Sequence, residues 1–264
     1  MEKVVEASNI RYSVGSCTIL DGVDISVQRG VFYSVVGPNG SGKTTLLNVL
    51  SGVVKPQEGE IKLMGRDIFS MSKRGVAKRV AVLPQNTEVL FDFCVFDVLL
   101  MGRHPYRGAI GSITDEDLRL VDKVAGALGL ESLLDRPMTR VSGGERQRCL
   151  LGRVIVQDTP IVFLDEATSN LDPFYTHEIL GRMREMVTKD NVTVVSVFHN
   201  LNLAVMYSDY IFFMKDGKIP FEGDVRNVVV PEVVESVFSV KVRVLLDKEY
   251  PYPIVIPDLG GRLP

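Results

Sequence analysis

Short apolar runs recur along the chain, and each ends at a glycine, a proline or a polar residue. They lie at residues 31–36, 80–83, 161–164 and 193–198. Apolar runs of this length, bounded by turn residues, are typical of strands buried on both faces of a sheet. Helix-forming stretches lie between them, for example after residue 44 and from Pro173 to about residue 189. The pattern therefore predicts an α/β fold with a buried sheet.

The beginning of the chain shows a different pattern, in which β-prone segments alternate with turn residues. Between residues 3 and 30 the turn signals are Asn9, Gly15, Asp21-Gly22 and Arg29-Gly30. This pattern predicts short antiparallel strands, and residues 60–64 predict one more strand. Near the end of the chain, strands at 210–214 and 218–221 flank Asp216-Gly217, which is a hairpin signal. A short helical stretch and a proline-rich extended tail follow.

Helix formers dominate from residue 91 to about residue 157. Thr114 and the acidic residues after it predict a helix N-terminus, and another helix would begin near Ser142. We therefore expect a single domain over residues 1–240. Its core and an antiparallel β subdomain would comprise residues 1–90 and 158–240, its helical subdomain residues 91–157, and residues 241–264 would form an extended tail.

The first apolar run leads into an octet that fits the pattern G-x-x-x-x-G-K-[ST]. Its residues are Gly37, Pro38, Asn39, Gly40, Ser41, Gly42, Lys43 and Thr44. A strand before this pattern and a helix after it are the context that a phosphate-binding loop requires. Glycines let backbone N–H groups approach phosphate oxygens, Lys43 would reach the β- and γ-phosphates, and the Thr44 hydroxyl is a ligand for Mg²⁺. The octet therefore predicts binding of a nucleoside triphosphate with Mg²⁺.

The other three apolar runs are also followed by residues whose side chains can take part in catalysis or bind a metal ion. Gln85 follows residues 80–83, Asp165 and Glu166 follow residues 161–164, and His199 follows residues 193–198. Ligands of open α/β sheets bind at the carboxyl ends of the strands, so we expect these side chains to converge beside the bound phosphates. Taken alone, the acidic pair is as consistent with a solvated turn, and a lone histidine is more often structural. Together they predict a phosphoryl-transfer site.

Composition, charge and cysteine content indicate which kinds of partner and site to expect. The 264 residues are 45% apolar and 24% charged, as in ordinary globular proteins, and the net charge is −3. Acidic and basic residues are interspersed, so we expect no nucleic-acid partner. Cys17, Cys94 and Cys149 are scattered, which favours small buried hydrophobes over a disulfide framework or a zinc site. We expect no signal peptide, and no apolar run approaches the ~18 residues that span a bilayer.

The ordered set of motifs resembles the ATP-binding subunit of an ABC transporter from about residue 1 to residue 239. The motifs are the phosphate loop, Gln85, Ser142-Gly143-Gly144-Glu145-Arg146-Gln147, Leu164-Asp165-Glu166, Ser169-Asn170-Leu171-Asp172 and His199. The resemblance implies a P-loop NTPase core of the RecA-like type with the β and helical subdomains described above. It also implies an enzyme that hydrolyses ATP with Mg²⁺.

The resemblance implies a role for each site residue. Glu166 would be the general base, Lys43 and His199 would contact the γ-phosphate, and Gln85 would reach the attacking water. Mg²⁺ would be held by Thr44, Gln85 and Asp165. ATP would contact the phosphate loop and Thr45, with Tyr12 stacked on the adenine. Since the chain already has one phosphate loop, the second anion site at Ser142, Gly143, Gly144 and Glu145 would close over the ATP of a second copy.

A narrower resemblance points to importers of iron-siderophore, haem or cobalamin. It rests on residues 101–106, on His199-Asn200-Leu201-Asn202-Leu203-Ala204 and on the tail at residues 252–257, although that group usually has aspartate where Asn200 stands. Such a subunit would work with two membrane permease subunits and, indirectly, a substrate-binding protein, at the cytoplasmic face of the membrane. The motor residues specify neither the transported substrate nor the direction of transport.

Three alternatives remain from the sequence alone. A non-transport ABC ATPase linked to nucleic acid usually carries a long coiled-coil insert or tandem cassettes, and no long heptad run follows Gln85. A P-loop GTPase or kinase would have no role for the motif at Ser142, and the guanine-reading N-K-x-D is absent from the sequence. A purely structural nucleotide-binding module is disfavoured by Glu166 and His199.

The stretch after Gln85 is the predicted contact with a membrane subunit. Residues 91–106 follow Gln85 directly, so movement of Gln85 would also move them. Apolar contact would come from Leu90, Phe91, Phe93, Val95 and Phe96, and Arg103 and Arg107 would hold carbonyls or acidic side chains of the partner. About half of these apolar residues are equally expected in the core of the helical region.

Overall fold

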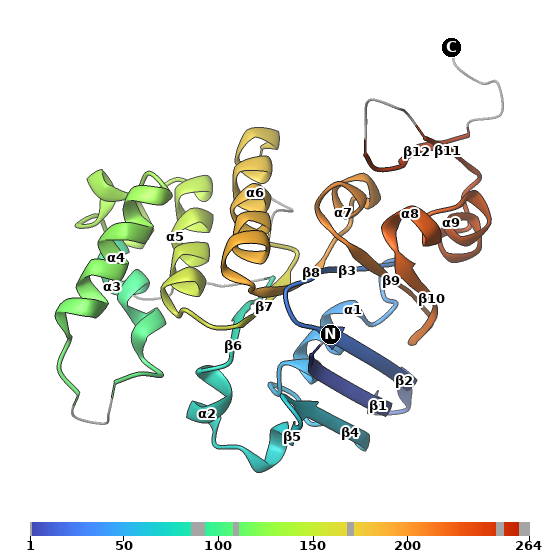
Figure 1. Ribbon diagram of the computed structural model, residues 1–264, viewed down its shortest axis with the longest axis horizontal. Helices are drawn as coiled ribbons and strands as arrows, with labels where there is room; N and C mark the ends of the chain where they lie inside the picture. Colours follow the sequence, from blue (N-terminus) through green and yellow to red (C-terminus); the bar gives the residue numbers. More distant parts are fainter. Residues whose placement is uncertain (1, 86–92, 108–110, 168–171, 247–250, 259–264) are drawn as a thin grey trace. The chain divides into compact units, whose positions relative to one another are not determined.

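The computed structural model describes residues 2–85, 93–107, 111–167, 172–246 and 251–258 (Figure 1). Contacts between Cα atoms divide the chain into two compact units. The first unit comprises Met1–Ser70 and Arg184–Pro264, and the second unit comprises Met71–Met183. The division into subdomains expected from the sequence stays a prediction.

The first unit begins with an antiparallel sheet in the order β2-β1-β4-β5. Its strands are β1 Lys3–Val14, β2 Cys17–Gln28, β4 Glu58–Leu63 and β5 Arg66–Asp67. The prediction of short strands between residues 3 and 30 is wrong, because β1 and β2 each run for 12 residues. Asn9 (φ 50°) and Gly22 (φ 69°) lie inside these strands, where the register between β1 and β2 shifts. Single residues in the left-handed region here produce bulges and not chain reversals.

A second sheet region in the first unit carries the buried strand that precedes the phosphate loop. β3 Phe32–Val36 lies between β8 Thr193–Val197 and β9 Tyr210–Lys215 and runs parallel to both. All five residues of β3 and all five of β8 are buried, as their apolar sequences predict. β10 Lys218–Asp224 pairs antiparallel with β9 through the predicted hairpin. The helices that follow β3 and β8 are α1 Lys43–Leu50 and α7 Leu201–Tyr207.

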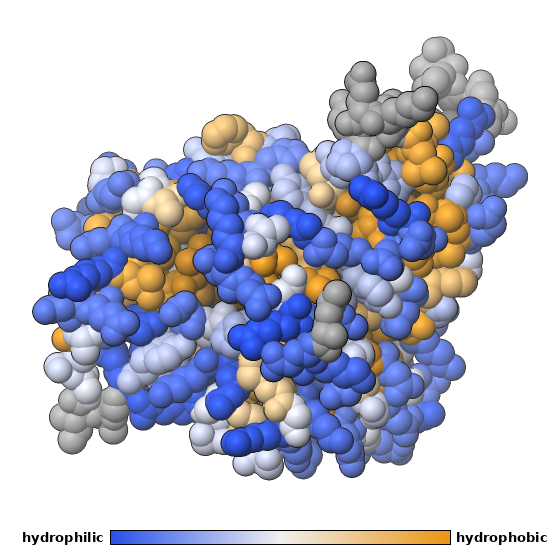
Figure 2. All heavy atoms as spheres, in the orientation of Figure 1, coloured by the Kyte–Doolittle hydropathy of each residue, from blue (hydrophilic) through white to orange (hydrophobic). Residues whose placement is uncertain are grey.

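The end of the chain contains more regular structure than the predicted extended tail. After α8 Val225–Val228 and α9 Pro231–Phe238, the antiparallel strands β11 Val242–Leu245 and β12 Ile254–Pro257 pair with each other. Val242 and Val255 are buried, whereas Leu245 and Ile256 are 47% and 44% exposed. Figure 2 shows hydrophobic surface in this C-terminal region, on a face that is otherwise mostly hydrophilic. The strand pair therefore packs one face inward and leaves apolar side chains on the other.

The second unit contains two parallel buried strands and a group of helices. β6 Val80–Leu83 pairs in parallel with β7 Ile161–Asp165. The helices are α2 Lys73–Ala77, α3 Val95–Leu100, α4 Asp115–Ala127 and α5 Gly143–Val156. Short 3₁₀ turns lie at Ile68–Ser70 in the first unit and at Met101–Arg103, Glu131–Leu133 and Met138–Arg140 in the second. The long helix α6 Pro173–Asp190 begins in the second unit and ends in the first.

Local sequence explains where these helices begin and how closely they pack. Thr114 caps α4 as predicted: its hydroxyl accepts from the Asp117 N–H (3.2 Å), and the Asp117 carboxylate accepts from the Thr114 N–H (3.1 Å). In α5, a Cβ added at Gly152 would lie 2.5 Å from a methyl carbon of Leu99 in α3. Any larger residue at this position would displace the Leu99 side chain, so Gly152 is a packing residue.

Candidate functional site

The phosphate loop connects β3 to α1 through backbone conformations that favour glycine. Gly40 and Gly42 have φ values of 78° and 100°, in the left-handed region, and Gly42 caps α1. Gly37 is required for a different reason: a Cβ there would lie 2.0 Å from the carbonyl oxygen of Met214 on β9. The loop is therefore fixed both by its own conformation and by close packing against a neighbouring strand.

Lys43 lies against the backbone of this loop. Its side chain is buried, and the ammonium donates to the carbonyl oxygens of Gly37 (3.0 Å) and Pro38 (2.8 Å). Thr44 and Thr45 follow in the first turn of α1, and both are partly exposed. A buried cation beside glycine-rich backbone at a helix N-terminus is the chemistry of a phosphate site.

Ser41 supplies a feature that the sequence did not reveal. Its hydroxyl oxygen is buried and has no hydrogen-bond partner in the part of the chain that the structure describes. An unsatisfied buried hydroxyl costs about 1–3 kcal/mol, and a bound oxyanion would supply the missing partner. The sequence predicted Ser41 as an ATP contact within the phosphate loop, but only the three-dimensional arrangement shows that its hydroxyl lacks a partner.

Tyr12 lies on β1 directly opposite Leu20 on β2. Leu20 is fully buried, and its side chain would be 3.2 Å from a Cβ added at Gly42. Directly paired residues of adjacent antiparallel strands point to the same face of the sheet. The Tyr12 side chain is half-buried and therefore lies on the face that meets the phosphate loop. Its role in stacking on adenine stays a prediction.

His199 follows β8 at the edge where the phosphate loop begins. In the parallel register, Val35 is paired with Val197. Gly37 and His199 each lie two residues beyond this pair, so the expected convergence holds within the first unit. His199 is exposed, and the Asn200 side chain after it accepts from the N–H groups of Asn202 (2.9 Å) and Leu203 (3.2 Å). Asn200 thus caps α7, a role that an aspartate at this position would also fill.

Gln85 and Glu166 form the corresponding pair in the second unit. Leu83 is paired with Leu164 in the parallel register, and Gln85 and Glu166 each lie two residues further along. Nε2 of Gln85 donates to Oε2 of Glu166 at 2.5 Å. Asp165, at the end of β7, is buried. The sequence predicted both positions at strand ends, and the structure brings them into contact.

The backbone of Glu166 has a φ of 53°. For a residue with a side chain, this left-handed conformation costs on the order of 1 kcal/mol, and such residues cluster at functional sites. Gln147 donates to the carbonyl oxygen of Ala167 at 2.6 Å and so ties α5 to the segment that follows Glu166. The sequence identified Gln147 only as part of a motif and gave no signal of this contact.

The motif at Ser142 forms the exposed N-terminus of α5. The Ser142 hydroxyl accepts from the Glu145 N–H (3.3 Å), and the Glu145 carboxylate accepts from the Ser142 N–H (2.7 Å). These hydrogen bonds to Ser142 lower the pKa of Glu145, with the backbone N–H as the main cause. A Cβ at Gly143 would meet no atom within 4 Å. The predicted helix start is confirmed, and the helix end is open to an external ligand.

Within each unit, parallel strands bring predicted site residues together: Gly37 and His199 in the first unit, and Gln85 and Glu166 in the second. That the phosphate loop and His199 meet Asp165, Glu166 and Gln85 around one nucleotide stays a prediction, as do the roles of the individual residues. Residues 169–171 of the expected motif lie outside the described residues. Asp172 is described, and its carboxylate accepts from the N–H of Tyr175 (3.1 Å) in the first turn of α6.

The predicted contact with a membrane subunit is wrong for two of its residues. Arg103 is only 7% exposed, and it donates to the Asp117 carboxylate (2.7 Å) and to the Val156 carbonyl oxygen (3.2 Å). Val95 is fully buried in the helical region. Leu90 and Phe91 lie outside the described residues. Phe93, Phe96 and Arg107 are at least partly exposed, so for them the prediction stands.

Among the described residues, no group of three or more histidine, cysteine, aspartate or glutamate side chains is arranged to hold a metal ion. None of the described helices has both the length and the hydropathy that a bilayer crossing requires.

Comparison with known proteins identifies relatives along nearly the whole chain. A cobalamin import ATP-binding protein of Halobacterium salinarum is 35% identical over 243 residues, which is 92% of this chain and 61% of that protein. The chain therefore spans less than two thirds of that relative. The petrobactin import ATP-binding protein of Bacillus subtilis is 33% identical over 239 residues, 90% of this chain and 94% of its own length.

Solved structures share the fold. A chain from an inward-facing ABC transporter, assigned to the metal-chelate type, has a TM-score of 0.83 and 25% identity, and the match covers 97% of this chain and 98% of that one. A dimeric ATP-binding cassette with bound ADP and Pi has a TM-score of 0.74 and 27% identity, with 84% and 99% covered. The α/β fold with an antiparallel β region, predicted from the sequence, is confirmed. Since the family model described as ABC transporter also matches residues 20–169, this chain belongs to the ABC transporter family, and it is an ATP-binding cassette of that family.

Proposed function

We propose that the chain hydrolyses ATP with Mg²⁺ and thereby powers the import of a metal chelate or of cobalamin through membrane permease subunits. The observation that carries the proposal is the match to the petrobactin import ATP-binding protein over 94% of that protein's length. The relatives named for cobalamin and iron(3+)-hydroxamate import support the same substrate class. The chemistry of the candidate site supports the hydrolytic step.

Binding of ATP would use the groups of the phosphate loop. The backbone N–H groups of residues 39–45 and the Lys43 ammonium would donate to the phosphate oxygens, and the buried Ser41 hydroxyl would gain its missing partner. Tyr12 would stack on the adenine. His199, at the same sheet edge as Gly37, would contact the γ-phosphate. Recognition of the triphosphate would thus come mainly from the first unit.

Hydrolysis would use Glu166 to accept a proton from the attacking water. Gln85 donates to the Glu166 carboxylate through its amide nitrogen, so its amide oxygen is the group that would face the water or the metal. Thr44, Gln85 and Asp165 provide a hydroxyl, an amide and a carboxylate, and these oxygen donors fit Mg²⁺. When bound, Mg²⁺ would neutralise charge on the transferred phosphoryl group.

The assembly would contain a second copy of the chain and two permease subunits. Ser142, Gly143, Gly144 and Glu145 form an exposed helix N-terminus, which would close over the ATP held by the other copy. The cassettes would sit at the cytoplasmic face of the membrane, where Phe93, Phe96 and Arg107 would contact the permease. A substrate-binding protein would deliver the chelate to the opposite side.

The test is to isolate the tagged chain from detergent-solubilised membranes and to identify what accompanies it. We expect a polytopic permease, and vesicles containing the complex should take up a ferric hydroxamate only with ATP and Mg²⁺. The Glu166→Gln complex is the matched control, since it should assemble but not transport. Co-purification with nucleic acid or ribosomes, and without a permease, would instead support the non-transport ABC ATPase.

A further inference from the structure

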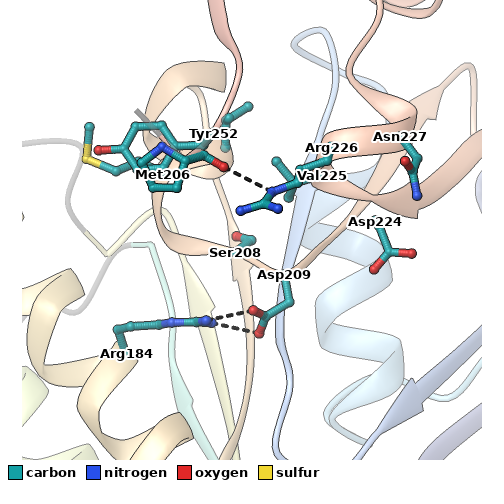
Figure 3. Close-up of a pocket in the computed structure, with 11 residues that line it drawn as sticks. Arg184, Met206, Ser208, Asp209, Asp224, Val225, Arg226, Asn227 and Tyr252 are labelled. Atoms are coloured by element: carbon teal, nitrogen blue, oxygen red, sulfur yellow. Dashed lines mark hydrogen bonds and ion pairs between the residues drawn. The ribbon is translucent and has the colours of Figure 1, made fainter. Parts of the chain in front are cut away.

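The segment at residues 251–257 runs beside α7, the short helix that follows His199. At one end of α7, Tyr252 and Met206 line the same cavity, and Nε of Arg226 on α8 donates to the Pro251 carbonyl oxygen at 3.0 Å (Figure 3). This cavity has a volume of about 560 Å³ and is also lined by Val205 and Asp209. The C-terminal segment therefore meets the last turn of α7.

The same segment meets the first turn of α7 through two reciprocal hydrogen bonds. The Asn202 amide nitrogen donates to the Val255 carbonyl oxygen (3.0 Å), and the Val255 N–H donates to the Asn202 amide oxygen (2.8 Å). A planar amide paired in this way is fixed in both position and rotation. We call this contact the Asn202–Val255 pair.

The N–H and C=O groups of one strand residue point to the same side of the strand. Since both groups of Val255 face Asn202, they face away from the paired strand β11. The Asn202–Val255 pair thus uses the free edge of β12 and does not compete with the hydrogen bonds between β11 and β12. It can be broken without removing a rung of that two-stranded sheet.

Position along the chain links this pair to His199. The Asn200 side chain caps α7 by accepting from the N–H of Asn202. Asn202 therefore contacts the helix cap through its backbone and the C-terminal segment through its side chain. An isolated helix of seven residues is unstable, and its orientation depends on what it packs against. A groove of about 460 Å³ lined by His199, Asn200, Phe238 and Val255 places the tail in the immediate surroundings of His199.

We propose that Asn202 is a positioning residue for His199: the C-terminal segment, through the Asn202–Val255 pair, fixes the start of α7 and so aims His199 at the γ-phosphate. The inference rests on the proposed function. It also assigns a shared role to the segments at residues 199–204 and 252–257, which the sequence analysis identified separately. The phosphate loop and Lys43 belong to β3 and α1, so the pair should affect the hydrolytic step and leave ATP affinity unchanged.

The first experiment breaks the pair from each side. Asn202→Ala removes the amide, and Val255→Pro removes the N–H donor at the free edge of β12, where proline is tolerated. Each variant should lower kcat about tenfold, equivalent to about 1.4 kcal/mol, with KM for ATP within about twofold of the wild type. The double variant should lose no more than either single one. Asn227→Ala, an exposed asparagine on α8, is the matched control and should keep full activity.

A second comparison separates positioning from general destabilisation. In a His199→Ala background, Asn202→Ala should cause no further loss of kcat, because the residue through which it acts is gone. Losses that multiply in the double variant would overturn the proposal, and so would wild-type kcat in both Asn202→Ala and Val255→Pro. If Asn202→Ala folds poorly, Val255→Pro in the same His199→Ala background decides the question.

A spectroscopic measurement requires no turnover. The chain has three histidines, so the His199 ring resonances can be assigned by comparison with His199→Ala. Both Asn202→Ala and Val255→Pro should shift the His199 signals and leave those of His104 and His177 in place. An unshifted His199 signal would overturn the proposal. Failure of the proposed function is distinguishable, since the wild-type chain would then show no Mg²⁺-dependent ATP hydrolysis or would be isolated without a permease, whereas the His199 resonances report on the Asn202–Val255 pair in either case.

Discussion

Gln85 and Glu166, 81 residues apart in sequence, are joined by a hydrogen bond of 2.5 Å between the Gln85 amide nitrogen and the Glu166 carboxylate. The parallel register of β6 and β7 produces this contact, because both residues lie two positions beyond the pair Leu83 and Leu164. The amide restricts the rotation of the carboxylate. In the proposed function Glu166 is the general base, and a general base must be held at the correct angle to the water that it activates, so we predict that this contact affects the rate of hydrolysis.

Replacing Glu166 with Gln should slow ATP hydrolysis by ~10²–10⁴, the usual contribution of a general base. ATP binding should persist, because the phosphate loop is unchanged. Gln85→Ala should have a smaller effect in the same direction, since it releases the carboxylate without removing it. Lys43→Ala, which removes the buried cation, should abolish turnover by weakening nucleotide binding. Steady-state hydrolysis and equilibrium binding of a fluorescent ATP analogue distinguish these results, and wild-type rates in Glu166→Gln and Lys43→Ala would refute the assignment.

The left-handed backbone of Glu166 predicts an unusual order of stability. At this φ of 53°, glycine is unstrained and alanine is not, so Glu166→Gly should be about 1 kcal/mol more stable than Glu166→Ala. At Lys123, an exposed position in the interior of α4, the order should reverse, because alanine is the better helix former. Urea unfolding of Glu166→Gly, Glu166→Ala, Lys123→Gly and Lys123→Ala gives the difference in stability between glycine and alanine at each position. Equal stability of Glu166→Gly and Glu166→Ala would show that the backbone is not strained in solution.

The sequence predicted the elements that local signals specify. Buried strands were evident from apolar runs such as residues 161–164, and helix starts from caps such as Thr114 and Ser142. Asn9 and Asp21-Gly22 were misjudged, since a residue in the left-handed region has the same sequence signal in a turn and in a bulge. Only the pairing partner decides between these two structures.

The predicted positions of site residues agree with the structure where position along a strand fixes them, and the roles of these residues stay predictions. Gln85 and Glu166, and likewise Gly37 and His199, follow from strand ends and parallel register. The sequence could not indicate that Arg103 is buried, because that depends on Asp117 reaching it from another helix. Nor could it indicate the Asn202–Val255 pair or the unsatisfied Ser41 hydroxyl, since these depend on how segments distant in sequence pack.

Two glycines of the phosphate loop should respond differently to the same substitution. A Cβ at Gly37 would lie 2.0 Å from a backbone oxygen, so Gly37→Ala should destabilise the protein by more than about 3 kcal/mol. At Gly40 a Cβ meets nothing within 4 Å, and only the left-handed backbone, at about 1–2 kcal/mol, opposes alanine. Thermal and urea unfolding of Gly37→Ala and Gly40→Ala measure the loss of stability in each variant. A similar loss of stability in the two variants would contradict the packing argument.

The exposed helix start at Ser142 predicts dimerisation that depends on ATP. Glu166→Gln should be monomeric without nucleotide and dimeric at saturating ATP, because a ligand buried between two copies stabilises the dimer by mass action. Adding Ser142→Arg should keep this variant monomeric by blocking the second anion site. Light scattering over micromolar protein concentrations provides the measurement. A monomer at saturating ATP in the single variant would count against the two-copy ATP site.

The buried ion pair between Arg103 and Asp117 should make stability depend on pH. Burial raises the pKa of Asp117, but hydrogen bonds from Arg103 and Thr114 outweigh it and hold the pKa below the usual value of 3.8. A carboxyl whose folded-state pKa is depressed contributes stability that is present above its unfolded pKa of about 3.9 and is lost as pH falls through the folded value.

Asp117→Asn should therefore be less stable than the wild type at pH 7, by about 2–3 kcal/mol, and this difference should shrink as pH falls below about 4. Asp122→Asn, at an exposed position in the interior of the same helix, should show neither effect. Urea unfolding between pH 7 and pH 3 tests both variants, and a difference between Asp117→Asn and the wild type that stays constant over this range would show that the carboxylate charge does not stabilise the fold.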